Sequence, residues 1–263
     1  MNPIANLDRY IERMCKSIPD KAFFIDKVDA HIFVDYGCAD GELFTFVDRV
    51  HYDYKRRYLG YDTDQHMVDE CFKRQIPNSY FSTDWNELLN LLKAAKKSNS
   101  KTCLILSSVL HEIYSYLSTA EIAEFWNRIN DFDYIVIRDM GVTRELNWED
   151  TDPRDILRVK SSNFPKSELN LHEAINGSIN NKKSFVHFLL KYQYLDNWKR
   201  EVCENYLPFG VEDILGRFKE THQLLYFEHF TLPWLKNKVK EDFGVDLTER
   251  THYKMVLERP RRS

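Results

Sequence analysis

Carboxylates stand in this chain at points where an apolar run gives way to a glycine turn. Asp35 ends one such run two residues before Gly37, and Asp40 lies at the far side of the same turn. Asp62 likewise ends a second apolar run. Where a strand ends at a tight turn and leads into a helix, α/β folds form the mouth of a nucleotide-type pocket. The sequence therefore predicts a ligand pocket with an acidic wall.

The acids indicate which kind of ligand such a pocket accepts. A dinucleotide pyrophosphate binds at the N-terminus of the first helix, where free N–H groups and the helix dipole attract negative charge. Asp35 and Asp40 flank that position and would repel a pyrophosphate by on the order of 1 kcal/mol or more. The turn has Gly37 and Gly41 but lacks the third glycine of the dinucleotide fingerprint. A phosphate-free ligand with cationic groups is favoured instead.

Apolar runs and helical patterns alternate through the first half of the chain. The runs predict strands at residues 31–35, 58–62, 79–81, 102–106 and 132–138. Helical patterns lie between them at residues 42–50, 65–74, 108–116 and 119–129, and one more begins at 84. Right-handed crossovers between such strands give a parallel sheet that helices cover on both faces. The predicted class is therefore α/β, with a doubly wound and mostly parallel sheet.

The alternation breaks near Met140. Residues 151–220 are polar and mainly helical, with loops expected at 161–170 and 176–183. An insertion at the ligand-bearing edge of a sheet is a natural place for a lid over a second substrate. Basic residues of this segment are expected on a solvated helix face, because acids lie among them. They are Lys182, Lys183, Lys191, Lys199 and Arg200.

Strand patterns return after the insertion at 222–228 and 251–258, with a helix from Pro233 between them. Before the first strand, apolar residues recur at helical spacing, at Ile4, Leu7, Ile11, Met14 and Ile18. The predicted organisation has three parts. They are a helical cover at residues 1–30, an α/β core at 31–150 and 221–263, and the helical insertion at 151–220.

Composition bounds the class of protein. The chain has 263 residues, of which 43% are hydrophobic and 30% charged, which is typical of a globular protein. Its formal net charge of −4 gives no whole-chain argument for nucleic-acid binding. The five cysteines form no C-x-x-C pair, which favours a reducing compartment without disulfides. With no apolar run long enough to span a bilayer, we expect a cytoplasmic protein.

Five segments, taken in order, resemble motifs of the class I S-adenosylmethionine-dependent methyltransferases. They are residues 34–41 (VDYGCADG), 60–62 (GYD), 82–85 (STDW), 106–112 (LSSVLHE) and 251–257 (THYKMVL). The resemblance covers about residues 31–139 and 221–258, and it departs from the family at Ala39, where a glycine is common. It implies a seven-stranded sheet whose last strand is antiparallel. It also implies S-adenosylmethionine as cofactor, whose ammonium and sulfonium groups suit an acidic turn.

The resemblance also implies roles for single residues. Asp35 and the Gly37 backbone, with Cys38 beside them, would hold the methionine end of the cofactor. Ser107 would line the same end. Asp62 would accept from the two ribose hydroxyls, a bidentate task suited to a carboxylate.

The adenine end of the cofactor is assigned to the segment after the third strand. Asp84 would accept from the adenine amino group, and Trp85 would lie beside the ring. Each residue has a structural alternative. Asp84 stands at the N-cap of a predicted helix, and Trp85 is a candidate for the hydrophobic core.

Methyl transfer needs a protein base only if the acceptor must lose a proton. His111 follows the fourth strand at the edge where the pocket opens, and is the candidate base or acceptor-orienting group. Asp139, just past the fifth strand, is the second candidate. Glu112 is expected to be a solvated helix residue. No zinc motif is formed, because Ser115 stands where H-E-x-x-H needs its second histidine, and no metal is expected.

These observations predict an enzyme that moves a methyl group from S-adenosylmethionine to an acceptor. A small-molecule acceptor is favoured by the negative net charge. One alternative is an RNA or DNA methyltransferase that binds through a local basic face of the insertion. Against this alternative, the chain lacks the Asn-Pro-Pro-Tyr-like run that amino-methylating nucleic-acid enzymes of this superfamily tend to show. A further alternative is a methyltransferase-shaped binding module without turnover.

Overall fold

The structure, a computed structural model, describes residues 17–96 and 100–260. The helix predicted from Ile4, Leu7, Ile11 and Met14 lies outside the described residues. What is described of this region is the short helix α2, Ile18–Lys21, which begins at Ile18 of the same pattern. Among the described residues, no helix has the length and apolar character needed to cross a membrane.

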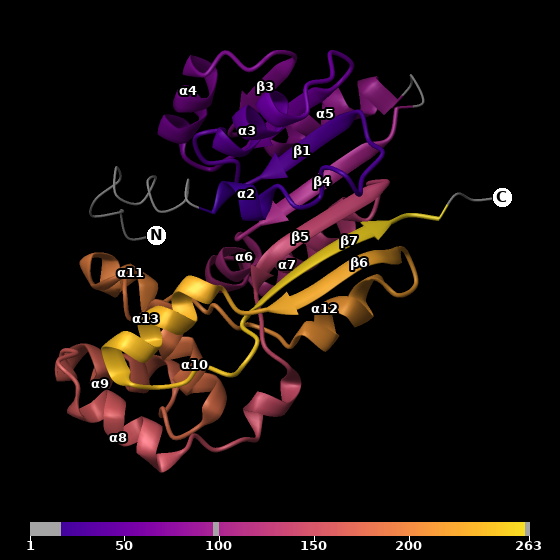
Figure 1. The fold of residues 1–263 in the computed structure, drawn as a ribbon. Coiled ribbons are helices and arrows are strands. Elements are labelled where there is room, and N and C mark those ends of the chain that lie inside the picture. Colours follow the sequence, from indigo (N-terminus) through magenta and orange to yellow (C-terminus); the bar gives the residue numbers. More distant parts are fainter. Residues whose placement is uncertain (1–16, 97–99, 261–263) are drawn as a thin grey trace.

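The centre of the molecule is a seven-stranded sheet with the strand order β3-β2-β1-β4-β5-β7-β6 (Figure 1). Strands β1 to β5 pair in parallel, and β7 is antiparallel to both β5 and β6. The strands are β1 Ile32–Tyr36, β2 Arg57–Tyr61, β3 Ser79–Ser82, β4 Thr102–Ser107, β5 Tyr134–Met140, β6 Gln223–Phe230 and β7 His252–Glu258. The predicted fold class is therefore confirmed, including the antiparallel last strand.

Helices cover both faces of this sheet because its buried strands alternate side chains between two apolar cores. Leu104 and Leu106 of β4 belong to one core, and Cys103 and Ile105 belong to the other. Helices α5 (Trp85–Lys96), α6 (Leu110–Tyr116), α7 (Thr119–Ile129) and α12 (Val211–Phe218) complete the first core. Helices α2, α3 (Glu42–Val50) and α4 (Gln65–Lys73) complete the second.

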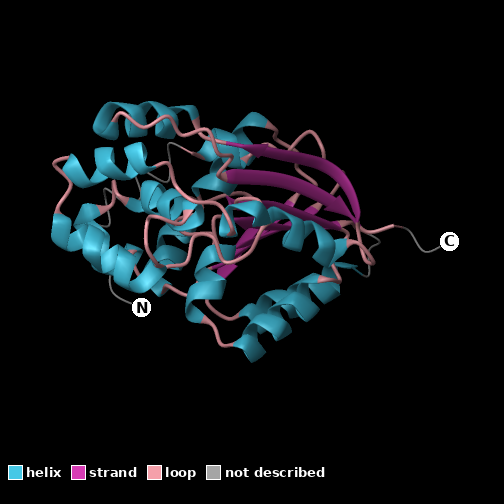
Figure 2. Cartoon of the chain, turned by 90° about the horizontal axis from the view of Figure 1, so that it is seen from below, coloured by secondary structure: helices cyan, strands magenta, loops and turns pink. Residues whose placement is uncertain are grey.

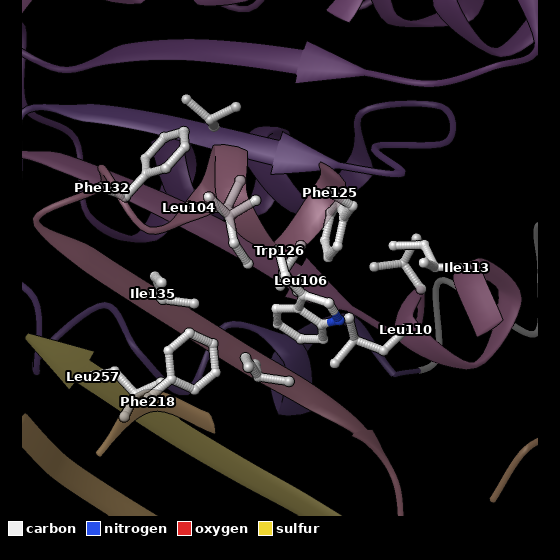
Figure 3. Packing of buried hydrophobic residues seen from close by; sticks show 14 of the residues in the cluster. Leu104, Leu106, Leu110, Ile113, Phe125, Trp126, Phe132, Ile135, Phe218 and Leu257 are labelled. Atoms are coloured by element: carbon white, nitrogen blue, oxygen red, sulfur yellow. The ribbon is translucent and has the colours of Figure 1, made fainter. Parts of the chain in front are cut away.

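The first core shows how the covering helices meet on the sheet. Trp126 of α7 and Phe218 of α12 pack edge to face, with ring centroids 5.7 Å apart (Figure 3). Helix α7 begins at a capping box, in which Ser118 and Glu121 each bond the other's backbone N–H group. This cap sets the start of the helix that carries Trp126.

The remaining helices form a separate group at one end of the sheet (Figures 1 and 2). They are α8 Pro153–Ser161, α9 Lys166–Asn176, α10 Lys182–Lys191, α11 Trp198–Glu201 and α13 Pro233–Phe243. They share a third apolar core, in which Leu235 and Val239 of α13 pack with Phe185 and Phe188 of α10. The loop expected at residues 161–170 is wrong in its second half, because α9 already begins at Lys166.

The central strand gives a direct test of this packing. Leu104 is fully buried, so Leu104→Ala removes methyl groups from a core that cannot collapse around the gap. We expect a loss of about 2–5 kcal/mol in the free energy of unfolding, measured by urea denaturation. The control is Leu224→Ala on edge strand β6, where the side chain is 42% exposed. It should cost about 1 kcal/mol or less, and equal losses at the two positions would contradict the assigned core.

Candidate active site

A cavity of about 810 Å³ opens beside the carboxyl ends of β1 and β4. These two strands are neighbours, and the strand order reverses between them. This is the place where open α/β sheets bind ligands. Six of the nine residues predicted for the site line the cavity: Asp35, Gly37, Cys38, Asp62, Ser107 and His111.

The turn after β1 has the backbone conformation that its glycines predict. Gly37 has φ +81°, and an added Cβ would come within 3.0 Å of Val109 Cγ2. Ala39 also takes a positive φ, 46°, which is unfavourable for a residue with a side chain. Its N–H group donates to Asp62 Oδ2 at 2.9 Å. This hydrogen bond helps to hold an alanine where the family commonly has a glycine.

Asp62 connects the two strand ends. Its Oδ1 accepts from the N–H group of Asp64 at 3.0 Å, so each carboxylate oxygen already has one backbone donor. A carboxylate oxygen has room for a second hydrogen bond. Burial raises the pKa of Asp62, although the N–H groups of Asp64 and Ala39 oppose this shift. The carboxylate is therefore held in a fixed position at the cavity wall.

Asp35 and Asp40 differ in how their charge is compensated. Asp35 is 4% exposed, and burial raises its pKa to about 7 despite the opposing charge of Lys21. Asp40 forms an ion pair with Arg74, which also pairs with Glu42. The prediction that both acids repel an anion is therefore wrong for Asp40. Arg74 neutralises Asp40, and the acidity of the turn comes from Asp35 together with Asp62.

Ser107 ends β4 and lines the cavity. Its hydroxyl oxygen is buried and finds no hydrogen-bond partner among the residues that the structure describes. An unsatisfied buried hydroxyl costs free energy, so this position favours a ligand with a polar group at that end. This observation fits the role that the family resemblance gives to Ser107.

His111 and Asp139 form a buried pair between α6 and the end of β5. The distance from His111 Nδ1 to Asp139 Oδ1 is 2.9 Å, and Asp139 also accepts from the N–H groups of Leu110 and Met140, both at 2.8 Å. Burial alone would lower the pKa of His111, but the charge and hydrogen bond of Asp139 raise it to about 9. Asp139 itself does not line the cavity and acts on it only through His111.

The insertion supplies the opposite wall of the cavity with a charged cluster that the sequence did not indicate. Arg200 Nε lies 2.8 Å from Glu204 Oε1, and its Nη2 lies 3.2 Å from Glu112 Oε1. Arg200 and Lys191 are buried, so the expectation of a solvated helix face is wrong for both. Glu112 is likewise tied to the insertion by Arg200. Helical spacing does not distinguish a buried charge with partners from a solvated one, so no signal in the sequence marked this cluster.

One group of side chains on this wall has ligand types that suit a metal. His111, Glu112 and Glu204 each offer a donor atom, and these atoms lie within 4.8 Å of one another. One histidine nitrogen and two carboxylates suit several divalent ions. Arg200 already bonds both carboxylates, however, and supplies the positive charge that a metal ion would bring.

The structure does not bring Asp84 and Trp85 to the cavity lining. Asp84 Oδ1 accepts from the N–H group of Asn86 at 2.8 Å, which caps the start of α5. Trp85 is 8% exposed and packs against Tyr36 and Tyr61, with ring centroids 5.0 and 5.4 Å away. Both residues have the structural roles that the sequence left open, and their contact with adenine stays a prediction.

The pair of His111 and Asp139 yields a prediction for NMR titration of the imidazole nitrogens. His111 should stay charged up to about pH 9, while His172, whose pKa burial lowers to about 4, should be neutral above pH 6. In Asp139→Asn the strongest of the effects that raise this pKa is gone, while burial and the smaller effects of Glu112 and Glu204 remain. The pKa of His111 should then fall well below 9. An unchanged titration in Asp139→Asn would contradict the assigned pair.

Comparison with known proteins is limited to structure. No family model matches the chain, and no curated protein matches it in sequence. Solved structures that resemble it include a SAM-dependent methyltransferase from Anabaena variabilis, with 10% identity, a TM-score of 0.49, and 99% of this chain and 96% of that chain covered. Another is the plantazolicin methyltransferase BamL with a desmethyl plantazolicin analogue and SAH, with 15% identity, a TM-score of 0.46, and 95% and 88% covered.

A third is an O-methyltransferase family protein from Burkholderia thailandensis, with 12% identity and a TM-score of 0.47, where 96% of this chain matches 59% of that one. Sequence identities this low indicate a shared fold at most. The fold is therefore assigned from the strand order and strand directions of this chain. The strand order and the antiparallel β7 show that the chain has the fold of the class I S-adenosylmethionine-dependent methyltransferases.

Proposed function

We propose that the protein is an S-adenosylmethionine-dependent methyltransferase that acts on a small molecule. The observation that carries this proposal is the set of residues that line one cavity. Asp35, Asp62 and Ser107 line the same cavity as His111. A cationic, phosphate-free cofactor and an acceptor would each find complementary groups there.

The residues that line the cavity suit the ribose and the methionine end of the cofactor. Asp62 would accept from the ribose hydroxyls with the lone pairs that Asp64 and Ala39 leave open. Asp35 would pair with the ammonium group of the methionine end, and a bound cation would favour the charged form of this carboxyl. Ser107 would gain the hydrogen-bond partner that it lacks. When bound, the cofactor supplies an activated methyl group on a sulfonium.

His111 is proposed to act on the acceptor. Asp139 holds the imidazole through Nδ1, which leaves Nε2 as the nitrogen that can serve a second partner. Below about pH 9 the ring is charged and would donate a hydrogen bond that orients the acceptor. Above that pH the ring is neutral and can take a proton from it. Much of the rate would come from holding acceptor and methyl group in line.

The lining of the cavity supports a small acceptor over a nucleic acid. Carboxylates outnumber lysines and arginines among the residues that line it. The carboxylates are Asp20, Asp35, Asp40, Glu42, Asp62, Glu112, Glu201 and Glu204, against Lys21, Arg138 and Arg200. A phosphate backbone needs the opposite balance. The volume of about 810 Å³ also lies within the range of about 300–1,000 Å³ typical of small-molecule sites.

Titration calorimetry with S-adenosylmethionine tests the cofactor assignment. The wild type should bind, and Asp62→Ala should bind at least about tenfold more weakly, because two hydrogen bonds to a charged group are lost. Asp69→Ala is the control, since Asp69 is an exposed acid on α4 outside the cavity lining. Absence of binding by the wild type would defeat the proposed function. Equal binding by Asp62→Ala would show that the cofactor is held differently.

A further inference from the structure

Glu201 is a buried carboxylate on the insertion side of the cavity. The residue is 4% exposed and lines the cavity wall. Its Oε2 accepts a hydrogen bond from the Tyr206 hydroxyl. Among the described residues, none donates to Oε1, and no lysine or arginine forms an ion pair with this side chain. A carboxylate in this position has capacity for a donor that comes from the ligand.

The two positively charged side chains near Glu201 interact with other groups. Arg200 bonds the carboxylates of Glu112 and Glu204. Lys191 is fully buried, and its ammonium donates to the main-chain oxygen of Glu204. Burial raises the pKa of Glu201 to about 7, and the charge of Glu204 adds to this effect while Arg200 and Lys191 oppose it. A cation bound directly to Glu201 would stabilise its charged form.

The surroundings of Glu201 suit the rest of such a ligand. Tyr206 packs edge to face on His111, with ring centroids 5.0 Å apart. Glu201 is therefore separated from His111 by one aromatic side chain. Leu190, Leu235 and the half-exposed Trp234 line the same cavity. They offer apolar surface within the cavity for the body of such a ligand.

We infer that the methyl acceptor carries an ammonium group on an apolar body, and that Glu201 binds this ammonium. The inference rests on the proposed function, because it names the acceptor class for the same cavity. A charge-assisted hydrogen bond to Oε1 would fix one end of the acceptor. The other end would then extend past Tyr206 to His111, where the nucleophilic atom meets the methyl group.

Three probes of similar shape test the charge requirement: phenethylamine, phenethyl alcohol and 3-phenylpropionate. Each is titrated at pH 8 into the protein saturated with S-adenosylhomocysteine. At this pH Glu201, with a pKa of about 7, is ionised, and the amine is still protonated. The amine should bind at least about tenfold more tightly than the alcohol and the acid. Glu201→Gln should abolish this preference, whereas Glu149→Gln, at an exposed site just before the insertion, should retain it.

Binding of S-adenosylhomocysteine separates the two proposals and reports on folding. Glu201→Gln should bind it as the wild type does, because the cofactor end is intact and glutamine keeps an acceptor for Tyr206. If the wild type does not bind it, the proposed function fails. If it binds but the amine shows no measurable affinity or no advantage, or if Glu201→Gln keeps the preference, the inference about the acceptor is overturned.

Discussion

Buried carboxylates crowd the carboxyl edge of this sheet, and a charge taken out of water needs a partner. The parallel strands and the loops after them bring the acids together at one edge. Asp139 is compensated by His111 and by two backbone N–H groups. Asp62 has two N–H donors of its own. Asp35 and Glu201 have less compensation within the chain, and the cavity lies in contact with both.

This distribution divides the cavity into two ends. The end next to β1 and β4 combines Asp35, Asp62 and an unsatisfied Ser107 hydroxyl, which together suit a cationic cofactor with a diol. The other end is built by α6 and the insertion, with His111 and Glu201 facing the same space. The helical group therefore contributes chemistry as well as cover. Its own apolar core, shared with α13, holds that wall in place.

Much of the α/β core was predictable because local patterns of apolar residues in the sequence determine its strands and helices. Apolar runs bounded by turns predicted the strands, and the helical pattern at residues 119–129 predicted α7. Two kinds of feature escaped prediction. One is pairing between distant residues, such as Arg74 with Asp40, which no spacing in the sequence expresses. The other is burial of charge, since Lys191 lies on a helix whose polar residues resemble a solvated face.

The same limit applies to the site. Asp35, Asp62 and Ser107 could be placed because each follows a recognisable strand. Glu201 has no such local marker, and it becomes significant only through its contact with Tyr206 and the cavity. Trp85 shows the reverse case, because it belongs to one of the motif segments and yet packs in the hydrophobic core.

Transfer of a labelled methyl group tests the central claim most directly. The protein is incubated with S-adenosylmethionine labelled at the methyl group and a cell extract, which is then separated into small molecules, nucleic acid and protein. We expect label in the small-molecule fraction with the wild type and little with Asp62→Ala. Label in the nucleic-acid fraction, or no transfer by a wild type that binds the cofactor, would contradict the account.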